Sequence, residues 1–443
     1  MSLTTPTKVR QLQRALYAKA KAQPTYRFYA LYDKIYRKDV LLWAWSCCRA
    51  NGGSCGVDRQ SFAGIESKGV EAWLDQLAKE LKEKTYRPQA VRRMMIPKPD
   101  GKQRPLGIPT IKDRVAQMAA VIVLEAIFEA DLMDEQYAYR PKRSAHEAIG
   151  EVHGLLNKGY REVVDADLSS YFDTIPHHEL MKSIARRVSD GAMLALIKSW
   201  LEMAVEEDDG KGGKCRTTRN KDSGRGTPQG APISPLLANL YMRRFLLGWK
   251  QAGWGKRLGA RIVNYADDFV ILCRGGKAQS AREIMEKMMQ KLKLTVNQQK
   301  TRICRVPEES FDFLGYTMGQ CYRAQTGQAY IGTKPSKKRV ARVCEKISQM
   351  TQQKWCWKET EDLVGELNLV LKGWGNYFRL GSVSKAYRAV DSHARHRLRQ
   401  WLCNKHKVSG AGRNRFRDEH LYQKLGLFRL QNYSKTMPWA QAT

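Results

Sequence analysis

The sequence predicts an α+β fold in which helices alternate with short strands of mixed direction. Apolar residues recur at helical spacing over long stretches, and short apolar runs that end in acids or tight turns lie between them. This alternation excludes a core that is all helix or all sheet. With 443 residues and 42% hydrophobic composition, the chain can bury a large core and is expected to form two or three domains.

Helical patterns dominate the first part of the chain. The first of them is amphipathic and ends at Asn51-Gly52-Gly53. Between the later ones, Met94 to Arg104 predicts two strands joined by a Pro-Asp-Gly turn. The predicted helical ranges are 8–50, 70–84, 112–130 and 144–157.

The middle of the chain predicts the mixed part of the fold. A strand at 162–167 is followed by a helix at 177–203 and by a polar, glycine-rich hairpin region at 204–225. A further helix is predicted at 278–293. From about residue 335 the pattern becomes helical and aromatic, and aromatic residues at this spacing are more often core than base-stacking platforms.

Two adjacent acids, Asp267 and Asp268, follow Tyr265-Ala266 between apolar runs that predict two short buried strands. Neighbouring carboxylates repel each other, so such a turn favours a bound cation, and hard oxygen ligands suit Mg²⁺. The alternative is a solvated hairpin turn, since Asp is common in turns.

A second acidic strand end lies upstream at Asp167. Two carboxylates from adjacent strands, Asp167 and Asp267, would hold two metal ions about 3.5–4 Å apart, as nucleotidyl transfer requires. We interpret the neighbouring Asp165 and Asp173 as solvated acids rather than ligands. Between these elements, the glycines and prolines of 224–235 predict a tight loop that lets a base pair approach the backbone.

The charge of the chain indicates a polyanionic partner. It has 77 Lys and Arg against 44 Asp and Glu, a net charge of +33 with a pI of about 9.8. Residues 1–110 carry 21 basic against 9 acidic residues, and residues 331–443 carry 23 against 8. Basic flanks around a nearly balanced centre are typical of a nucleic-acid binder. No apolar run approaches the length of a membrane span. None of the ten cysteines forms a Cys-x-x-Cys pair, so a zinc site is not expected.

In this order, the motifs resemble the catalytic palm of reverse transcriptases, and more narrowly the group II intron reverse transcriptase/maturase family. The resemblance covers nearly the whole chain, and the ordered matches make coincidence negligible. The motifs that carry it are Ala166 to His177, Gly226 to Asn239 and Tyr265 to Asp268, with Arg104 to Pro109 and Tyr139-Arg140-Pro141 upstream and Phe313 to Tyr316 and Gly373 to Phe378 downstream.

The resemblance implies a right-hand polymerase with fingers, an antiparallel palm sheet and an α-helical thumb. The expected division is an N-terminal extension with fingers at 1–145, a palm at 146–328, a helical thumb or maturase domain at 329–410, and a basic segment at 411–443. It also implies RNA-directed DNA synthesis with two Mg²⁺ ions, and a role in intron splicing and retrohoming.

The resemblance assigns roles to individual residues. Asp167, Asp267 and the backbone carbonyl of Leu168 would bind metal, with Asp268 as a supporting ligand. Phe172 would exclude a 2′-hydroxyl; the alternative is that it is only part of the palm core. Lys300 would act as a general acid on pyrophosphate, but a surface lysine is at least as plausible. The remaining nucleotide-binding candidates are Gln229 and, unless they form only a solvated hairpin tip, Lys98 and Arg104.

Basic residues near the C-terminus are predicted to contact phosphates of RNA or DNA. They are Arg395, Arg397, Arg399, Lys405, Lys407, Arg413, Arg415 and Arg417.

The expected partners are group II intron RNA, an RNA template paired with a DNA primer, target DNA and dNTPs, with no membrane. A bacterial cytoplasmic, nucleoid-associated protein is expected, although the acid-poor N-terminus is also compatible with an organellar transit peptide. The alternatives are a stand-alone reverse transcriptase in repair or defence, a viral RNA polymerase and a non-catalytic splicing chaperone. Without histidine and cysteine pairs at metal spacing, the chain is not expected to nick the second DNA strand.

Overall fold

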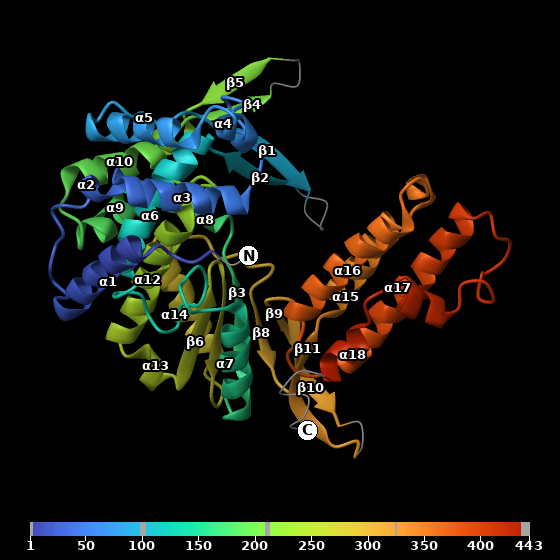
Figure 1. Cartoon of the computed structure of the whole chain (residues 1–443). Coiled ribbons are helices and arrows are strands. Elements are labelled where there is room, and N and C mark those ends of the chain that lie inside the picture. Colours follow the sequence, from blue (N-terminus) through green and yellow to red (C-terminus); the bar gives the residue numbers. More distant parts are fainter. Residues whose placement is uncertain (1–2, 98–102, 209–212, 324–325, 436–443) are drawn as a thin grey trace. The chain divides into compact units, whose positions relative to one another are not determined.

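The chain folds into two compact units. A computed structural model describes residues 3–97, 103–208, 213–323 and 326–435 (Figure 1). The first unit comprises Met1–Arg143, Ala166–Phe269 and Gln279–Thr301, and the second comprises Ser144–Asp165, Val270–Ala278 and Arg302–Thr443. Helices and short sheets alternate along both units, so the predicted α+β fold is confirmed.

Helix α6 (Ile111–Phe128) is the buried centre of the N-terminal region of the first unit, and α1 and α3 pack against it. Its N-terminus is capped by Thr110, whose side-chain oxygen accepts from the backbone N–H of Asp113 at 3.1 Å. The helices predicted in this region are confirmed. Their bounds are α1 Thr7–Ala22, α2 Tyr32–Ile35, α3 Lys38–Asn51, α4 Phe62–Glu66 and α5 Val70–Lys82.

The predicted hairpin around residue 100 forms part of a four-stranded sheet with the order β2-β1-β4-β5. Strands β1 (Val91–Pro97) and β2 (Gln103–Ile108) pair antiparallel, while β4 (Val205–Asp208) runs parallel to β1 and antiparallel to β5 (Lys214–Thr217). Lys98 lies outside the described residues, as does the side chain of Arg104.

The single helix predicted at 177–203 is wrong, because the chain forms two helices there, α9 (His177–Ala185) and α10 (Gly191–Leu201). Asp190 begins the second helix after the break. Its carboxylate accepts the backbone N–H of Met193 at 3.1 Å and so caps α10. The other oxygen accepts the N–H groups of Leu31 and Tyr32, both at 2.8 Å. Burial raises the pKa of Asp190, but these backbone hydrogen bonds outweigh it and the net shift is downward.

A second four-stranded sheet, with the order β6-β7-β3-β8, contains the predicted strand 162–167 and the predicted acidic hairpin. Strands β3 (Glu162–Asp167) and β8 (Arg302–Arg305) pair antiparallel, with Glu162 opposite Arg305. The apolar residues of β7 are buried. The remaining bounds are β6 Ala260–Tyr265, β7 Asp268–Cys273, α8 Tyr171–Thr174, α11 Arg219–Ser223, α12 Ser234–Gln251, α13 Trp254–Arg257 and α14 Ala278–Lys291.

The second unit ends in a helical bundle (orange to red in Figure 1), as predicted from residue 335 onward. Its core contains the aromatic residues Tyr387 and Trp401, which are 1% and 0% exposed, whereas Trp357 is 70% exposed. The helices are α15 Lys337–Met350, η1 Gln353–Trp355, α16 Thr360–Tyr377, α17 Ser384–Lys405, η2 His420–Lys424 and α18 Leu430–Lys435.

The same unit contains helix α7 (Ala145–Asn157) and a three-stranded antiparallel sheet with the order β11-β10-β9. The strands are β9 (Phe311–Phe313), β10 (Tyr316–Tyr322) and β11 (Ala329–Pro335). In the part of the chain that the structure describes, no helix is both long and apolar enough to cross a bilayer.

Candidate active site

The two adjacent acids lie at the turn between β6 and β7. Ala266 has a φ of 58°, a left-handed conformation that makes the turn tight. The buried side-chain amide of Asn264 donates to the carbonyl oxygen of Ala266 at 2.8 Å and supports this conformation. Asp267 is half-buried and Asp268 is exposed at the start of β7. The turn therefore presents both acids at its surface.

Asp167 is the last residue of β3, and the segment 295–301 fixes its backbone. Its carbonyl oxygen accepts the N–H of Asn297 at 2.8 Å, and its own N–H donates to the hydroxyl of Thr301 at 3.3 Å. Lys300 Nζ lies 3.4 Å from Asp167 Oδ2. The sequence analysis named Lys300 as a candidate. It missed the hydrogen bonds of Asn297 and Thr301, because both are made with Asp167, which lies far away along the chain.

The acid at the end of β3 and the acids of the β6–β7 turn belong to neighbouring strands of one sheet or to the turn beside them. Strands β3 and β7 are hydrogen-bonded neighbours in the sheet. The hydroxyl of Tyr171, just beyond β3, donates to the carbonyl of Ala238 at 2.7 Å. Burial raises the pKa of Tyr171 well above its ordinary value of 10, and the neighbouring Tyr241 and the negative charge of Asp267 add to this effect. The charge of Asp267 thus acts on a residue four positions after Asp167.

These donors suit a divalent cation. Asp167, Asp267 and Asp268 supply hard carboxylate oxygens, and Lys300 already places a positive charge beside one of them. Within the described residues, no three His, Cys, Asp or Glu side chains lie close enough together to hold a metal by themselves. Mg²⁺ is commonly bound by one or two carboxylates together with substrate phosphates, so this donor set fits it.

The glycine- and proline-rich loop is joined to the segment after β3 by hydrogen bonds. Thr227 donates its N–H to the carbonyl oxygen of Phe172 at 2.7 Å, and Gly226 donates to that of Ile175 at 2.9 Å. The ring Nε2 of His177 lies 2.7 Å from the carbonyl oxygen of Gly226. Burial lowers the pKa of His177, which favours the neutral ring. These contacts hold the loop against Phe172, whose side chain is 9% exposed.

Gln229, at the tip of this loop, donates its side-chain amide to the carboxylate of Asp173 at 2.8 Å. Its carbonyl oxygen accepts the N–H of Gly107 on β2 at 2.7 Å. Gly230 follows with a φ of +104°, and a Cβ there would lie 2.7 Å from the carbonyl oxygen of Gly107. Only glycine permits both this backbone conformation and this approach to β2.

Leu168 continues from Asp167 into an isolated bridge with Val296, and its side chain is 5% exposed. The structure therefore brings Asp167, Leu168, Phe172, Gln229, Asp267, Asp268 and Lys300 into the first unit.

The basic candidates near the C-terminus divide into two groups. Arg399 is buried and donates to the carbonyl of Phe416 and to Asp418, and Arg395 pairs with the same carboxylate. Arg397 donates to Thr351, and Lys405 donates to the backbone carbonyl oxygens of Cys356 and Lys358. These four side chains thus bind other parts of the bundle. The exposed group consists of Lys407, Arg413, Arg415 and Arg417.

Comparison with known proteins places the sequence among reverse transcriptases. Residues 96–318 match the family model "Reverse transcriptase (RNA-dependent DNA polymerase)", and residues 340–421 match "Group II intron, maturase-specific domain". The chain is 32% identical to Protein YkfC of Escherichia coli over 349 residues, 70% of this chain and 88% of that protein.

Two further relatives are encoded in introns, by their names. The chain is 29% identical to the group II intron-encoded protein LtrA of Lactococcus lactis over 65% of its own length and 56% of LtrA. It is 23% identical to an uncharacterized 91 kDa protein in the cob intron of Schizosaccharomyces pombe, over 78% of this chain and 50% of that protein. The chain thus spans about half the length of these two relatives.

Proposed function

The chain belongs to the reverse transcriptase family and carries a maturase-specific domain of the group II intron type, and we propose that it copies intron RNA into DNA by two-metal nucleotidyl transfer. The observation that carries the proposal is the position of Asp167 at the end of β3 and of Asp267 in the turn that leads into the neighbouring strand β7, with the charge of Asp267 acting on Tyr171. We further propose that the protein assists intron splicing and retrohoming.

The acids would hold the metal ions that this family generally uses. When bound, two Mg²⁺ ions would activate the 3′-hydroxyl of the primer and stabilise the charge on the leaving pyrophosphate. Asp167, Asp267 and the carbonyl oxygen of Leu168 would ligate them, and Asp268 would support the site. Lys300 balances Asp167 in the structure, and its ammonium group would donate a proton to pyrophosphate.

Other residues of the first unit would bind the nucleotide. Phe172 would stack under the deoxyribose and exclude a 2′-hydroxyl, which its anchored backbone supports. Gln229 would exchange its hydrogen bond with Asp173 for a contact to the templating pair. Arg104 and Lys98 would contact the triphosphate, since guanidinium and ammonium groups suit phosphate oxygens.

The exposed basic residues Lys407, Arg413, Arg415 and Arg417 would bind phosphates of intron RNA or target DNA. The match of residues 340–421 to a maturase-specific domain and the likeness to LtrA support this partner. We retain the division into fingers at 1–145, palm at 146–328, thumb at 329–410 and a basic segment at 411–443.

A stand-alone reverse transcriptase without a cognate intron is the second candidate. The similarity to YkfC, whose name mentions no intron and 88% of which is covered, is compatible with it. The two candidates share the polymerase and differ in whether the protein binds and splices an intron RNA.

Extension of a DNA primer on an RNA template tests the polymerase. Asp267→Asn should abolish Mg²⁺-dependent extension, because it removes a charged ligand without changing the size of the side chain. Asp165→Asn is the matched control, since Asp165 lies on the same strand as Asp167 but faces Arg302 at 3.7 Å. Extension by Asp267→Asn at the wild-type rate would contradict the assignment. Accelerated splicing of the intron RNA that flanks the gene would distinguish the two candidates.

A further inference from the structure

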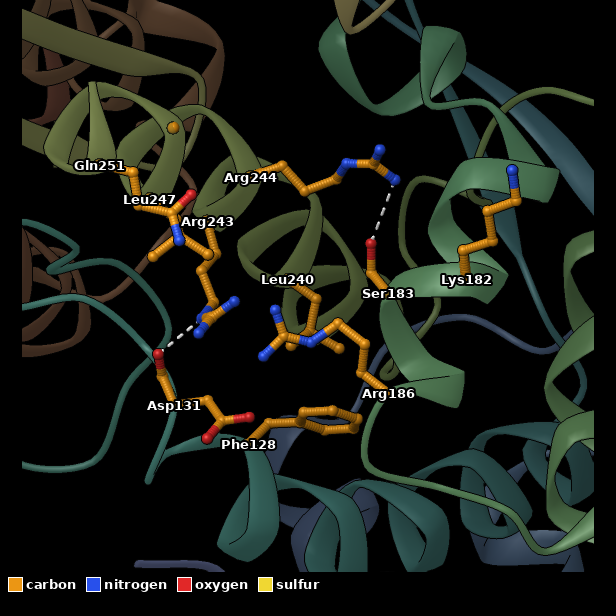
Figure 2. Close-up of a pocket in the computed structure, with 11 residues that line it drawn as sticks. Phe128, Asp131, Lys182, Ser183, Arg186, Leu240, Arg243, Arg244, Leu247 and Gln251 are labelled. Carbon is orange, nitrogen blue, oxygen red and sulfur yellow. Dashed lines mark hydrogen bonds between the residues drawn. The ribbon is translucent and has the colours of Figure 1, made fainter. Parts of the chain in front are cut away.

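A basic pocket of about 370 Å³ lies between α9, α12 and the end of α6 in the first unit (Figure 2). Its floor is apolar: Phe128 and Leu240, which line it with Leu247, are 1% and 4% exposed. Positively charged side chains surround this floor. They are Lys182, Arg186, Arg243 and Arg244.

The acids near the pocket balance only part of this charge. Glu179 is shared by Lys182 at 3.4 Å and Arg244 at 2.8 Å. The carboxylate of Asp131 pairs with the buried Arg187 at 3.3 Å. These three cations and two carboxylates leave one positive charge, to which the two remaining arginines of the pocket add.

Neither of those two arginines forms an ion pair with any residue that the structure describes. Arg243 donates its Nε to the carbonyl oxygen of Asp131 at 2.6 Å, a neutral partner, as Figure 2 shows. Arg186 is exposed and makes no side-chain hydrogen bond or ion pair with any described residue. Burial and the positive charges of Arg186 and Arg187 lower the pKa of Arg243, and they outweigh the opposite effect of the Asp131 charge. The pocket therefore holds crowded cations that an anion would stabilise.

The pocket and the catalytic acids of the candidate active site lie on different faces of α12. Tyr241 and Phe245 face the polymerase side: the Tyr241 hydroxyl donates to the carbonyl of Leu292 at 2.6 Å, and the Phe245 ring lies 5.6 Å from that of Phe269 on β7. At about 100° per residue, most of the pocket residues form a stripe along a part of the helix surface that does not face β7. That stripe consists of Leu240, Arg243, Arg244, Leu247 and Gln251.

We propose that this pocket binds one nucleotide unit of an RNA strand, away from the site of polymerisation. The phosphate would bind Arg186 and Arg243, because guanidinium groups make paired, charge-assisted hydrogen bonds with phosphate oxygens. The base would pack on the apolar floor of Phe128, Leu240 and Leu247. The choice of RNA as the ligand rests on the proposed function, whereas the anion-binding site rests on the pocket alone.

The affinity for a labelled single-stranded RNA of mixed sequence, measured over a range of salt concentrations, tests the proposal. Arg186→Glu should weaken binding about tenfold and reduce the salt slope by about 0.7, the contribution of one phosphate contact on a single strand. Gln251→Lys should tighten binding, a gain that misfolding cannot produce. Arg261→Glu is the matched control: Arg261 is exposed on β6, and among the described residues it likewise has no hydrogen-bonding or ionic partner.

Equal losses in Arg186→Glu and Arg261→Glu would overturn the proposal, since the effect would then be one of net charge. Binding of uridine monophosphate that depends on Arg186, without a matching effect on RNA, would overturn RNA as the ligand. Primer extension on a short template should be unchanged in Arg186→Glu. A wild type that binds RNA through Arg186 but extends no primer would refute the proposed polymerase and leave the pocket standing.

Discussion

Replacing Glu125 by Gln should stabilise the protein at pH 8 and change its stability by less than about 1 kcal/mol at pH 5. Glu125 lies on α6, and its carboxylate makes no ion pair or hydrogen bond with the described residues. Burial, with a smaller contribution from the charge of Glu129, raises its pKa from 4.5 to about 7. The folded state therefore holds a proton that the unfolded chain releases between these two values.

The sign and size of the effect follow from this difference in bound protons. Between pH 4.5 and about 7 the folded state binds one more proton than the unfolded state, so the free energy of unfolding falls as the pH rises. At about 1.4 kcal/mol per pH unit, the loss reaches about 3 kcal/mol above pH 7. Gln has the shape of protonated Glu and carries no charge, so Glu125→Gln should recover most of this loss.

Thermal denaturation of the wild type and of Glu125→Gln at pH 5 and pH 8 measures the effect. A recovery of about 3 kcal/mol should raise the Tm by several degrees at pH 8. Glu129→Gln is the control and should lower the Tm at pH 8. Glu129 pairs at 2.7 Å with Arg140, whose side chain is 5% exposed, and the substitution leaves that arginine without its ionic partner. An equal Tm difference at both pH values would refute the reasoning, since a raised pKa must appear as a pH dependence.

Two further predictions concern the nucleotide site and the helical bundle. Phe172→Val should raise ribonucleotide incorporation relative to deoxyribonucleotide incorporation in single-nucleotide extension, and an unchanged ratio would mean that the 9% exposed ring only packs in the core. Arg399→Met should destabilise the bundle by about 3 kcal/mol in thermal or urea unfolding, because it leaves the carbonyl of Phe416 without its donor and removes a partner of Asp418. Arg395→Met, at a more exposed pair with the same carboxylate, should cost less than about 1 kcal/mol, and equal costs would contradict the internal role of Arg399.

Short-range patterns were sufficient to predict the acidic elements of the site. The strand 162–167 and the two strands around Asp267 and Asp268 were predicted correctly, because apolar runs bounded by turn residues specify local structure. The antiparallel pairing of β1 with β2 was predicted for the same reason, since the two strands are close together in the sequence.

Only the tertiary structure determined features that depend on distant partners. Asp190 caps α10 and also accepts hydrogen bonds from Leu31 and Tyr32, which are about 160 residues away along the chain and which no local pattern indicates. Arg399 belongs to a basic run in the sequence, yet it is buried because Phe416 and Asp418 fold back onto it. Charge and periodicity report what a residue can do, whereas burial and hydrogen bonding are decided by the partners that the fold brings to it.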